Sequence, residues 1–201
     1  AHSEVLAAIA RDKNHTRMGS TVVALSLVDG DYTVAWVGDS RAYLWDGGEL
    51  VQLTVDHSHV RTLVDMGMLS HEDMDSHPDR HALTQSLGVS VDMKLDLGQR
   101  RGQLHAGQQI LLCSDGLTDE LTDTEIAGQL AACASPQEQV DGLVNAALRA
   151  GGRDNITVIM VGSVANTIHP KKGSGTKQVW YGSWQLALLA LVVALGLFVA
   201  L

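Results

Sequence analysis

The chain has 201 residues, of which 45% are hydrophobic, and this length and composition are sufficient for one well-packed domain. Its 14 Lys and Arg residues are outnumbered by 23 Asp and Glu residues, and the formal charge of −9 argues against a nucleic-acid-binding groove. The two cysteines, Cys113 and Cys133, lie in apolar segments, which predicts free thiols in a reducing compartment rather than a disulfide framework.

The first part of the chain predicts a helix followed by an antiparallel meander. Residues 3–13 place apolar side chains at helical spacing. Two β-branched runs, residues 20–28 and 31–39, flank Asp29-Gly30, a dipeptide typical of a hairpin turn. A second pair of apolar runs flanks Asp46-Gly47-Gly48, so we expect strands at residues 41–45 and 49–54.

Residues 57–92 are more polar than the segments around them. They contain two short helical candidates, residues 58–66 and 70–75, each of which begins with a serine suited to capping a helix. We expect this segment to lie outside the core as a mobile excursion.

The second part of the chain predicts a buried strand, two helices and a final strand. The apolar run in residues 108–114 has the length of a core strand. Thr122 with Glu125 and Ser135 with Glu138 form two capping-box patterns, each opening an amphipathic helix, and the last strand falls within residues 155–164. Because strands and helices come in blocks, the predicted class is α+β, an antiparallel sheet on sheet with helices outside.

The C-terminal residues have a different composition. Residues 163–178 are rich in Gly, Ser and Lys and predict a linker, and residues 184–201 carry no charged side chain. As a helix those residues would cover roughly 27 Å, close to the thickness of the hydrocarbon layer. We therefore expect a single transmembrane helix over residues 179–201, with a buried core helix as the alternative. Aromatic residues at its start and lysines before it predict that the preceding domain is cytoplasmic; they are Trp180, Tyr181, Trp184, Lys171, Lys172 and Lys177.

Three aspartates lie at predicted strand ends. Asp39 and Asp115 follow strands directly, and Asp154 precedes one. If these strands are neighbours, the carboxylates converge, and such a cluster requires cations to stay ionised. All-oxygen ligands suit Mg²⁺ or Mn²⁺. The alternative is that each aspartate is a separate turn or cap residue.

Six segments in series resemble the ordered motifs of the bacterial metal-dependent Ser/Thr protein phosphatases of type 2C (the PPM family). They are GSTVVAL, VGDSRAYL, LTVDHS, HPDRHALTQSLG, LLCSDGLTDEL and GGRDNITVIMV, and they lie within residues 18–162. The resemblance implies an α-β-β-α sandwich over residues 1–162, with a substrate flap at 57–92. It also implies hydrolysis of phosphoserine and phosphothreonine in proteins, such as the products of a Ser/Thr protein kinase.

The resemblance further implies the roles of individual residues. Asp115 and Asp154 would be ligands of two paired Mg²⁺ or Mn²⁺ ions, and Asp39 with Asp115 and Asp119 would hold a possible third. The attacking group would be a water bridging the metals, so no catalytic side chain is expected in this chain. Arg41 would have a structural role.

The sequence departs from the family pattern at its beginning. The N-terminal motifs, which carry further metal ligands and a phosphate-binding Arg, have no counterpart here. One interpretation is that the chain is a piece of a longer enzyme, with that Arg upstream. The other is a catalytically incomplete module that senses or tethers a partner at the membrane.

Overall fold

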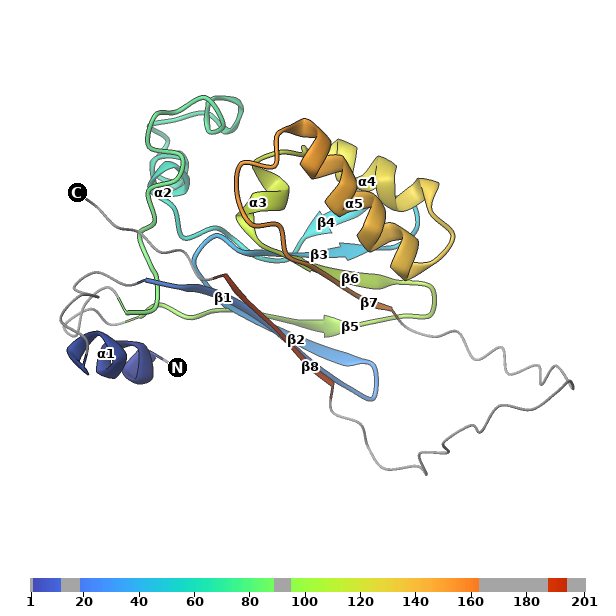
Figure 1. The fold of residues 1–201 in the computed structure, drawn as a ribbon, viewed down its shortest axis with the longest axis horizontal. Coiled ribbons are helices and arrows are strands. Elements are labelled where there is room, and N and C mark those ends of the chain that lie inside the picture. Colours follow the sequence, from blue (N-terminus) through green and yellow to red (C-terminus); the bar gives the residue numbers. More distant parts are fainter. Residues whose placement is uncertain (1, 12–18, 89–94, 163–187, 195–201) are drawn as a thin grey trace, which may run out of the picture.

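Two four-stranded antiparallel sheets face each other in the computed structural model, which describes residues 2–11, 19–88, 95–162 and 188–194 (Figure 1). The first sheet has the strand order β5-β2-β1-β8 and the second has the order β4-β3-β6-β7. The strands are β1 (Thr21–Val28), β2 (Asp31–Val37), β3 (Arg41–Trp45), β4 (Leu50–Gln52), β5 (Gly98–Gln103), β6 (Gln109–Cys113), β7 (Val158–Gly162) and β8 (Leu188–Ala194). The helices are α1 (His2–Arg11), α2 (His59–Asp65), the 3-10 turn η1 (His71–Asp73), α3 (Asp115–Thr118), α4 (Asp123–Ala132) and α5 (Pro136–Ala150).

The predicted β1–β2 hairpin is confirmed. Asp29 and Gly30 both have positive φ, 51° and 88°, and Val28 pairs with Asp31. Two consecutive positive φ values match the right-handed twist of the flanking strands, which is why Asp-Gly is favoured in two-residue hairpin loops.

The apolar strand β6 is the centre of the molecule, because both of its faces are buried. Ile110 and Leu112 belong to the core between the two sheets, whereas Leu111 and Cys113 belong to a second core beneath α4 and α5. Complete burial of one such aliphatic side chain contributes roughly 1.5–3 kcal/mol. A strand covered on both faces therefore has a continuous apolar run rather than an alternating one.

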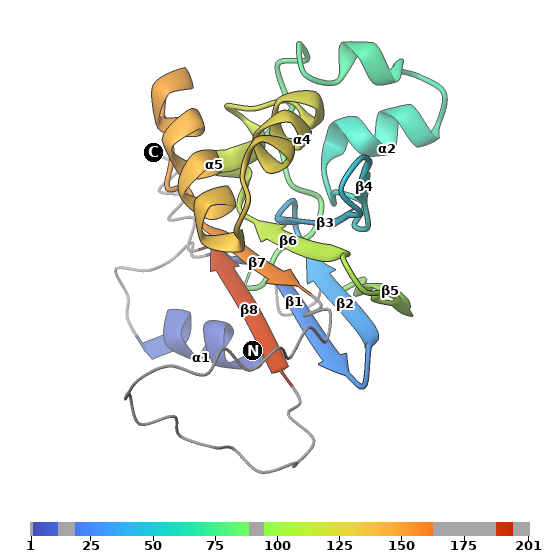
Figure 2. The same cartoon turned by 90° about the vertical axis from the view of Figure 1, so that its right-hand side faces the viewer.

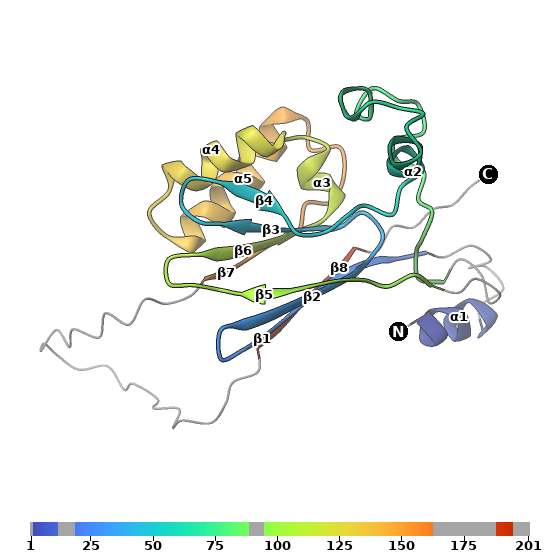
Figure 3. The same ribbon diagram turned by 180° about the vertical axis from the view of Figure 1, so that it is seen from behind.

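Helices α4 and α5 cover the outer face of the second sheet (Figure 2). Both predicted capping boxes are present, at Thr122 with Glu125 and at Ser135 with Glu138. The predicted helix at the start of the chain is also present as α1, but none of its residues is buried. It lies near the end of the first sheet, away from α4 and α5 (Figure 3). The expected α-β-β-α arrangement has helices on both outer faces of the sandwich. Within the described residues, helices pack on only one of these faces.

Strand β5 was not expected from the sequence GQRRGQ, which has no apolar alternation. It pairs with β2, where Gly98 lies opposite Trp36 and Gly102 opposite Tyr32. A Cβ atom would lie 2.2 Å from Trp36 Cε2 at Gly98 and 2.4 Å from Tyr32 Oη at Gly102. The two buried rings therefore cover the backbone of β5, and the glycines make room for them.

The structure differs from the predicted transmembrane helix at residues 188–194, which form strand β8. Each residue of β1 from Thr21 to Leu27 has an antiparallel partner in β8. A strand satisfies the backbone hydrogen-bonding groups along that edge of β1, which a helix cannot do. A continuous apolar run that shows neither helical nor strand periodicity is compatible with either structure. No helix among the described residues is long and apolar enough to cross a membrane. Residues 179–187 and 195–201, and the predicted linker at 163–178, lie outside the described part of the chain.

Candidate active site

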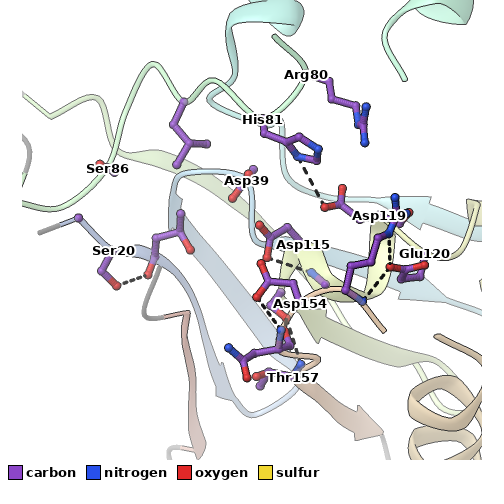
Figure 4. A pocket seen from close by; sticks show the side chains of 17 residues that line it. Ser20, Asp39, Arg80, His81, Ser86, Asp115, Asp119, Glu120, Asp154 and Thr157 are labelled. Atoms are coloured by element: carbon purple, nitrogen blue, oxygen red, sulfur yellow. Dashed lines mark hydrogen bonds and ion pairs between the residues drawn. The ribbon is translucent and has the colours of Figure 1, made fainter. Parts of the chain in front are cut away.

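A cavity of about 570 Å³ lies at one end of the sandwich, where four loops and the start of β1 meet (Figure 4). The loops follow β2 and β6, precede β7, and come from the predicted flap. All four predicted metal ligands line this cavity, so the structure brings together side chains that are up to 115 positions apart (154 − 39); they are Asp39, Asp115, Asp119 and Asp154.

Asp39 is positioned by a tight turn after β2. Gly38 has a φ of +109°, and a Cβ atom there would lie 2.4 Å from Thr21 Cγ2. The Gly38 N–H donates to His57 Nδ1 at 3.3 Å, and the hydroxyls of Thr21 and Ser40 are 2.9 Å apart. These contacts hold the turn against the start of β1 and direct Asp39 toward the cavity (Figure 4).

Asp115 is positioned by the end of β6. Its Oδ1 accepts a hydrogen bond from the Gly116 N–H at 2.9 Å. The preceding residue, Ser114, is buried and donates through Oγ to the Asn155 carbonyl oxygen at 3.0 Å, while the same Oγ accepts from the Thr157 N–H at 3.0 Å. The start of α3, which carries Asp115, is thereby joined to the turn that carries Asp154.

Asp154 belongs to the exposed turn between α5 and β7. Its Oδ1 accepts from the Asn155 N–H at 2.6 Å. The Asn155 carbonyl oxygen accepts a hydrogen bond from Ser114 Oγ, which holds this turn against the end of β6.

The cavity is electrostatically unfavourable for carboxylates. Burial, together with the charges of Asp115, Asp56 and Asp119, raises the pKa of Asp39 to about 7. Burial and the charges of Asp119 and Asp154 raise the pKa of Asp115, and burial raises the pKa of Asp119. Groups that destabilise one another's charged forms in this way are relieved by a cation.

The donor chemistry of this cluster fits a hard divalent ion. All four side chains offer carboxylate oxygens, the ligands that Mg²⁺ and Mn²⁺ prefer, and such ions commonly keep several waters. No group of three or more His, Cys, Asp and Glu side chains within the described ranges is close enough to form a complete metal site.

Several cavity residues have basic or neutral partners that sequence reasoning missed. His81 Nδ1, on the flap, lies 3.6 Å from Asp119 Oδ2. The Glu120 side chain is only 2% exposed and accepts a hydrogen bond from Arg153 Nε at 2.8 Å. His81 and Arg153 are far from these partners in sequence, so no local pattern identifies the pairs.

Arg41 has the structural role that was predicted for it. Its guanidinium donates to both carboxylate oxygens of Asp56, at 2.9 Å from Nε and 2.7 Å from Nη2. The pair joins β3 to the segment that leads into the flap.

Two curated relatives are bacterial protein phosphatases. The chain is 37% identical over 153 residues to protein phosphatase PhpP of Streptococcus pneumoniae, covering 76% of this chain and 61% of PhpP. It is 37% identical over 162 residues to the serine/threonine protein phosphatase PstP of Mycobacterium tuberculosis, covering 79% of this chain and 30% of PstP. Residues 3–163 match the family model described as Stage II sporulation protein E.

The chain belongs to the bacterial type 2C phosphatase family. Its fold agrees with solved members. The M. tuberculosis phosphatase PstP matches with a TM-score of 0.69 at 35% identity, over 79% of this chain and 66% of that structure. The catalytic domain of PstP in complex with two manganese ions matches with a TM-score of 0.70 at 32% identity, over 82% and 67%. The chain spans about 61% of PhpP and 30% of PstP, so it corresponds to part of each curated relative.

Proposed function

We propose that this chain is part of a metal-dependent phosphatase that hydrolyses phosphoserine and phosphothreonine in proteins. One observation carries the proposal: Asp39, Asp115, Asp119 and Asp154 line a single cavity at the end of a type 2C sandwich. Phosphoproteins made by a Ser/Thr protein kinase are the proposed substrates. Exposed flap residues Arg80 and His81 lie at the same cavity and offer positive charge and hydrogen-bond donors to a phosphorylated segment.

In this proposal Asp115 and Asp154 hold a pair of Mg²⁺ or Mn²⁺ ions, and Asp39 with Asp115 and Asp119 holds a third. When bound, such ions activate a water and neutralise the phosphoryl oxygens during displacement. The protein's own contribution is to hold the carboxylates at fixed positions, through the turn at Gly38 and the hydrogen bonds of Ser114. Fixed charges that need no rearrangement during the reaction are the main source of electrostatic stabilisation in such sites.

Mutation of the candidate ligands in the full-length parent protein tests the proposal. With Mn²⁺ and a phosphothreonine peptide, Asp115→Asn and Asp154→Asn should each lower kcat/KM by about 100-fold or more, equivalent to roughly 2.7 kcal/mol of transition-state stabilisation. A chelator should abolish the activity of the parent protein. Asp141→Asn is the matched control, because Asp141 is an exposed residue of α5 bonded only to Gln137 among the described contacts. Turnover by the two ligand variants close to that of the control would contradict the assignment.

We also propose that residues 179–201 can cross a membrane as a single helix and place the phosphatase domain on the cytoplasmic side. The uncharged run at 184–201 and the three lysines at 171, 172 and 177 support this proposal. Residues 188–194 cannot be a transmembrane helix and strand β8 at the same time, so insertion requires their release from β1. Flotation with phospholipid vesicles tests it: the protein should float, and the same protein without residues 179–201 should not. Equal behaviour of the two would refute the membrane role.

A further inference from the structure

Two loop regions carry the candidate ligands: residues 114–120, which include the short helix α3, carry Asp115, and the turn before β7 carries Asp154. Ser114 joins the two on the inner side. The Ser114 N–H donates to the Thr157 carbonyl oxygen at 3.1 Å, in addition to the two bonds of its hydroxyl. A Cβ atom at Gly116 would lie 2.5 Å from the Asn155 carbonyl oxygen, so the backbones are in direct contact. These contacts fix the two loops at the side nearest the core.

The outer side of the same two loops is joined by Glu120 and Arg153. Glu120 Oε1 accepts from the Arg153 N–H at 3.1 Å and from Arg153 Nε at 2.8 Å, while Arg153 Nη2 donates to the Asp119 carbonyl oxygen at 3.3 Å. The carboxylate also rests on Gly151, where a Cβ atom would lie 2.7 Å from Glu120 Oε2. One carboxylate thus binds the turn immediately before Asp154 through both backbone and side chain.

The burial of this pair is asymmetric. The Glu120 side chain is 2% exposed, whereas the Arg153 side chain is 67% exposed. A surface ion pair of long side chains would contribute little, because solvent screens it and both chains lose conformational entropy. Here the Glu120 carboxylate accepts hydrogen bonds from both the backbone and the side chain of Arg153, so the contact also fixes the backbone of the turn. The contacts between Glu120 and Arg153 therefore fix the turn before β7 relative to the segment after α3.

We propose that Glu120 and Arg153 are positioning residues that fix Asp154 relative to Asp115 and thereby set the affinity for divalent cations. In Figure 4 Glu120 and Asp119 lie on one side of the cavity and Asp115 and Asp154 beside them. The inference rests on the proposed metal-dependent function, but it concerns two residues that are not among the proposed metal ligands. Residues that orient metal ligands typically change metal affinity by about 10–100-fold when they are mutated.

The test measures Mn²⁺ affinity of the full-length parent protein by titration, with electron paramagnetic resonance of the free ion as the readout. Glu120→Ala and Arg153→Ala should each weaken binding by about tenfold. The double variant should be about as weak as Glu120→Ala alone, because Glu120→Ala removes both bonds of the pair, whereas Arg153→Ala leaves the backbone N–H that donates to Glu120. Glu120→Gln keeps an acceptor for the Arg153 N–H and should restore affinity to within about threefold of the parent.

Two controls separate positioning from general stability. Glu125→Ala removes the capping box of α4, which lies outside the cavity, and should lower the Tm without changing Mn²⁺ affinity. Arg149→Ala removes an exposed cation from the last turn of α5 and should change neither quantity. Unchanged affinity in Glu120→Ala with a Tm loss like that of Glu125→Ala would overturn the proposal.

Steady-state kinetics with a phosphothreonine peptide distinguish the remaining outcomes. If Arg153→Ala raised KM for the peptide and left Mn²⁺ affinity unchanged, Arg153 would be a substrate contact and the positioning role would be wrong. A parent enzyme that requires Asp115 and Asp154 but is insensitive to Glu120→Ala would refute this inference alone. A parent protein whose Mn²⁺ affinity depends on Glu120 and Arg153, but which has no phosphatase activity, would support the inference and refute the proposed function.

Discussion

The carboxyl group of Asp39 shows how the cavity acts on a single residue. Its pKa is raised from 3.8 to about 7 by burial and by neighbouring carboxylates. Between these two values the folded protein retains a proton that the unfolded chain has lost. The free energy of unfolding therefore falls as the pH rises from about 4 to about 7, and the penalty is complete at higher pH.

We predict that Asp39→Asn stabilises the metal-free protein above pH 7. The variant cannot acquire the buried charge, so at pH 8 in chelator its free energy of unfolding should exceed that of the parent by on the order of 2 kcal/mol. At pH 3 both proteins carry a neutral group there and should have similar Tm values. Saturating Mn²⁺ should raise the Tm of the parent more than that of the variant. Thermal unfolding over pH 3–8 checks this, and a lower Tm for Asp39→Asn at pH 8 in chelator would contradict it.

Strand β5 shows, at the scale of one element, how packing can override a sequence pattern. Its two glycines lack side chains, and each is covered by an aromatic ring from β2. The ring supplies the apolar surface that the strand itself does not have. Because the glycines lie opposite Trp36 and Tyr32, the register between the two strands is also specified by these contacts.

We predict opposite effects of the same substitution in two elements. Gly98→Ala introduces a Cβ atom 2.2 Å from the buried Trp36 ring and should lower the free energy of unfolding by about 1–3 kcal/mol. Gly128→Ala places a Cβ atom in open space in the exposed middle of α4, and should raise the free energy of unfolding by about 0.5–1 kcal/mol through helix propensity. Urea denaturation of both variants measures the difference. Effects of the same sign would show that the Trp36 ring does not exclude a side chain at position 98.

At the scale of the whole molecule, the two cores share the second sheet. The core between the sheets positions β1 and β2, and the core beneath α4 and α5 positions the ends of β6 and β7. The cavity forms where both sets of strand ends meet. The apolar C-terminal run adds β8 to the edge of β1, so the first sheet and the proposed membrane segment compete for the same residues.

We predict that membranes change the protection of β1. In aqueous solution the amides of β1 that bond to β8 should exchange slowly with deuterium, because a strand partner protects them. With phospholipid vesicles the same amides should exchange faster, since insertion of residues 188–194 withdraws that partner. Hydrogen exchange of peptides covering Thr21–Leu27 measures this, with β6 as an internal control whose protection should not change. Equal protection of β1 in both conditions would mean that the run does not leave the sheet.

The amino-acid sequence by itself determined the elements whose signals are local. The Asp29-Gly30 hairpin, the two capping boxes and the apolar strand β6 follow from short-range geometry and from the burial of apolar side chains. The positions of Asp39, Asp115 and Asp154 at strand ends were visible for the same reason, and they do line one cavity.

Only the tertiary structure decided the features whose partners are distant along the chain. Glu120 is held by Arg153, 33 residues away, and β5 exists because the rings of β2 cover it. The run at 188–194 is apolar enough for a helix or a strand, and the open edge of β1 selects the strand. In each case the local residues permit more than one structure, and the free energy of contacts made after the chain has folded chooses between them.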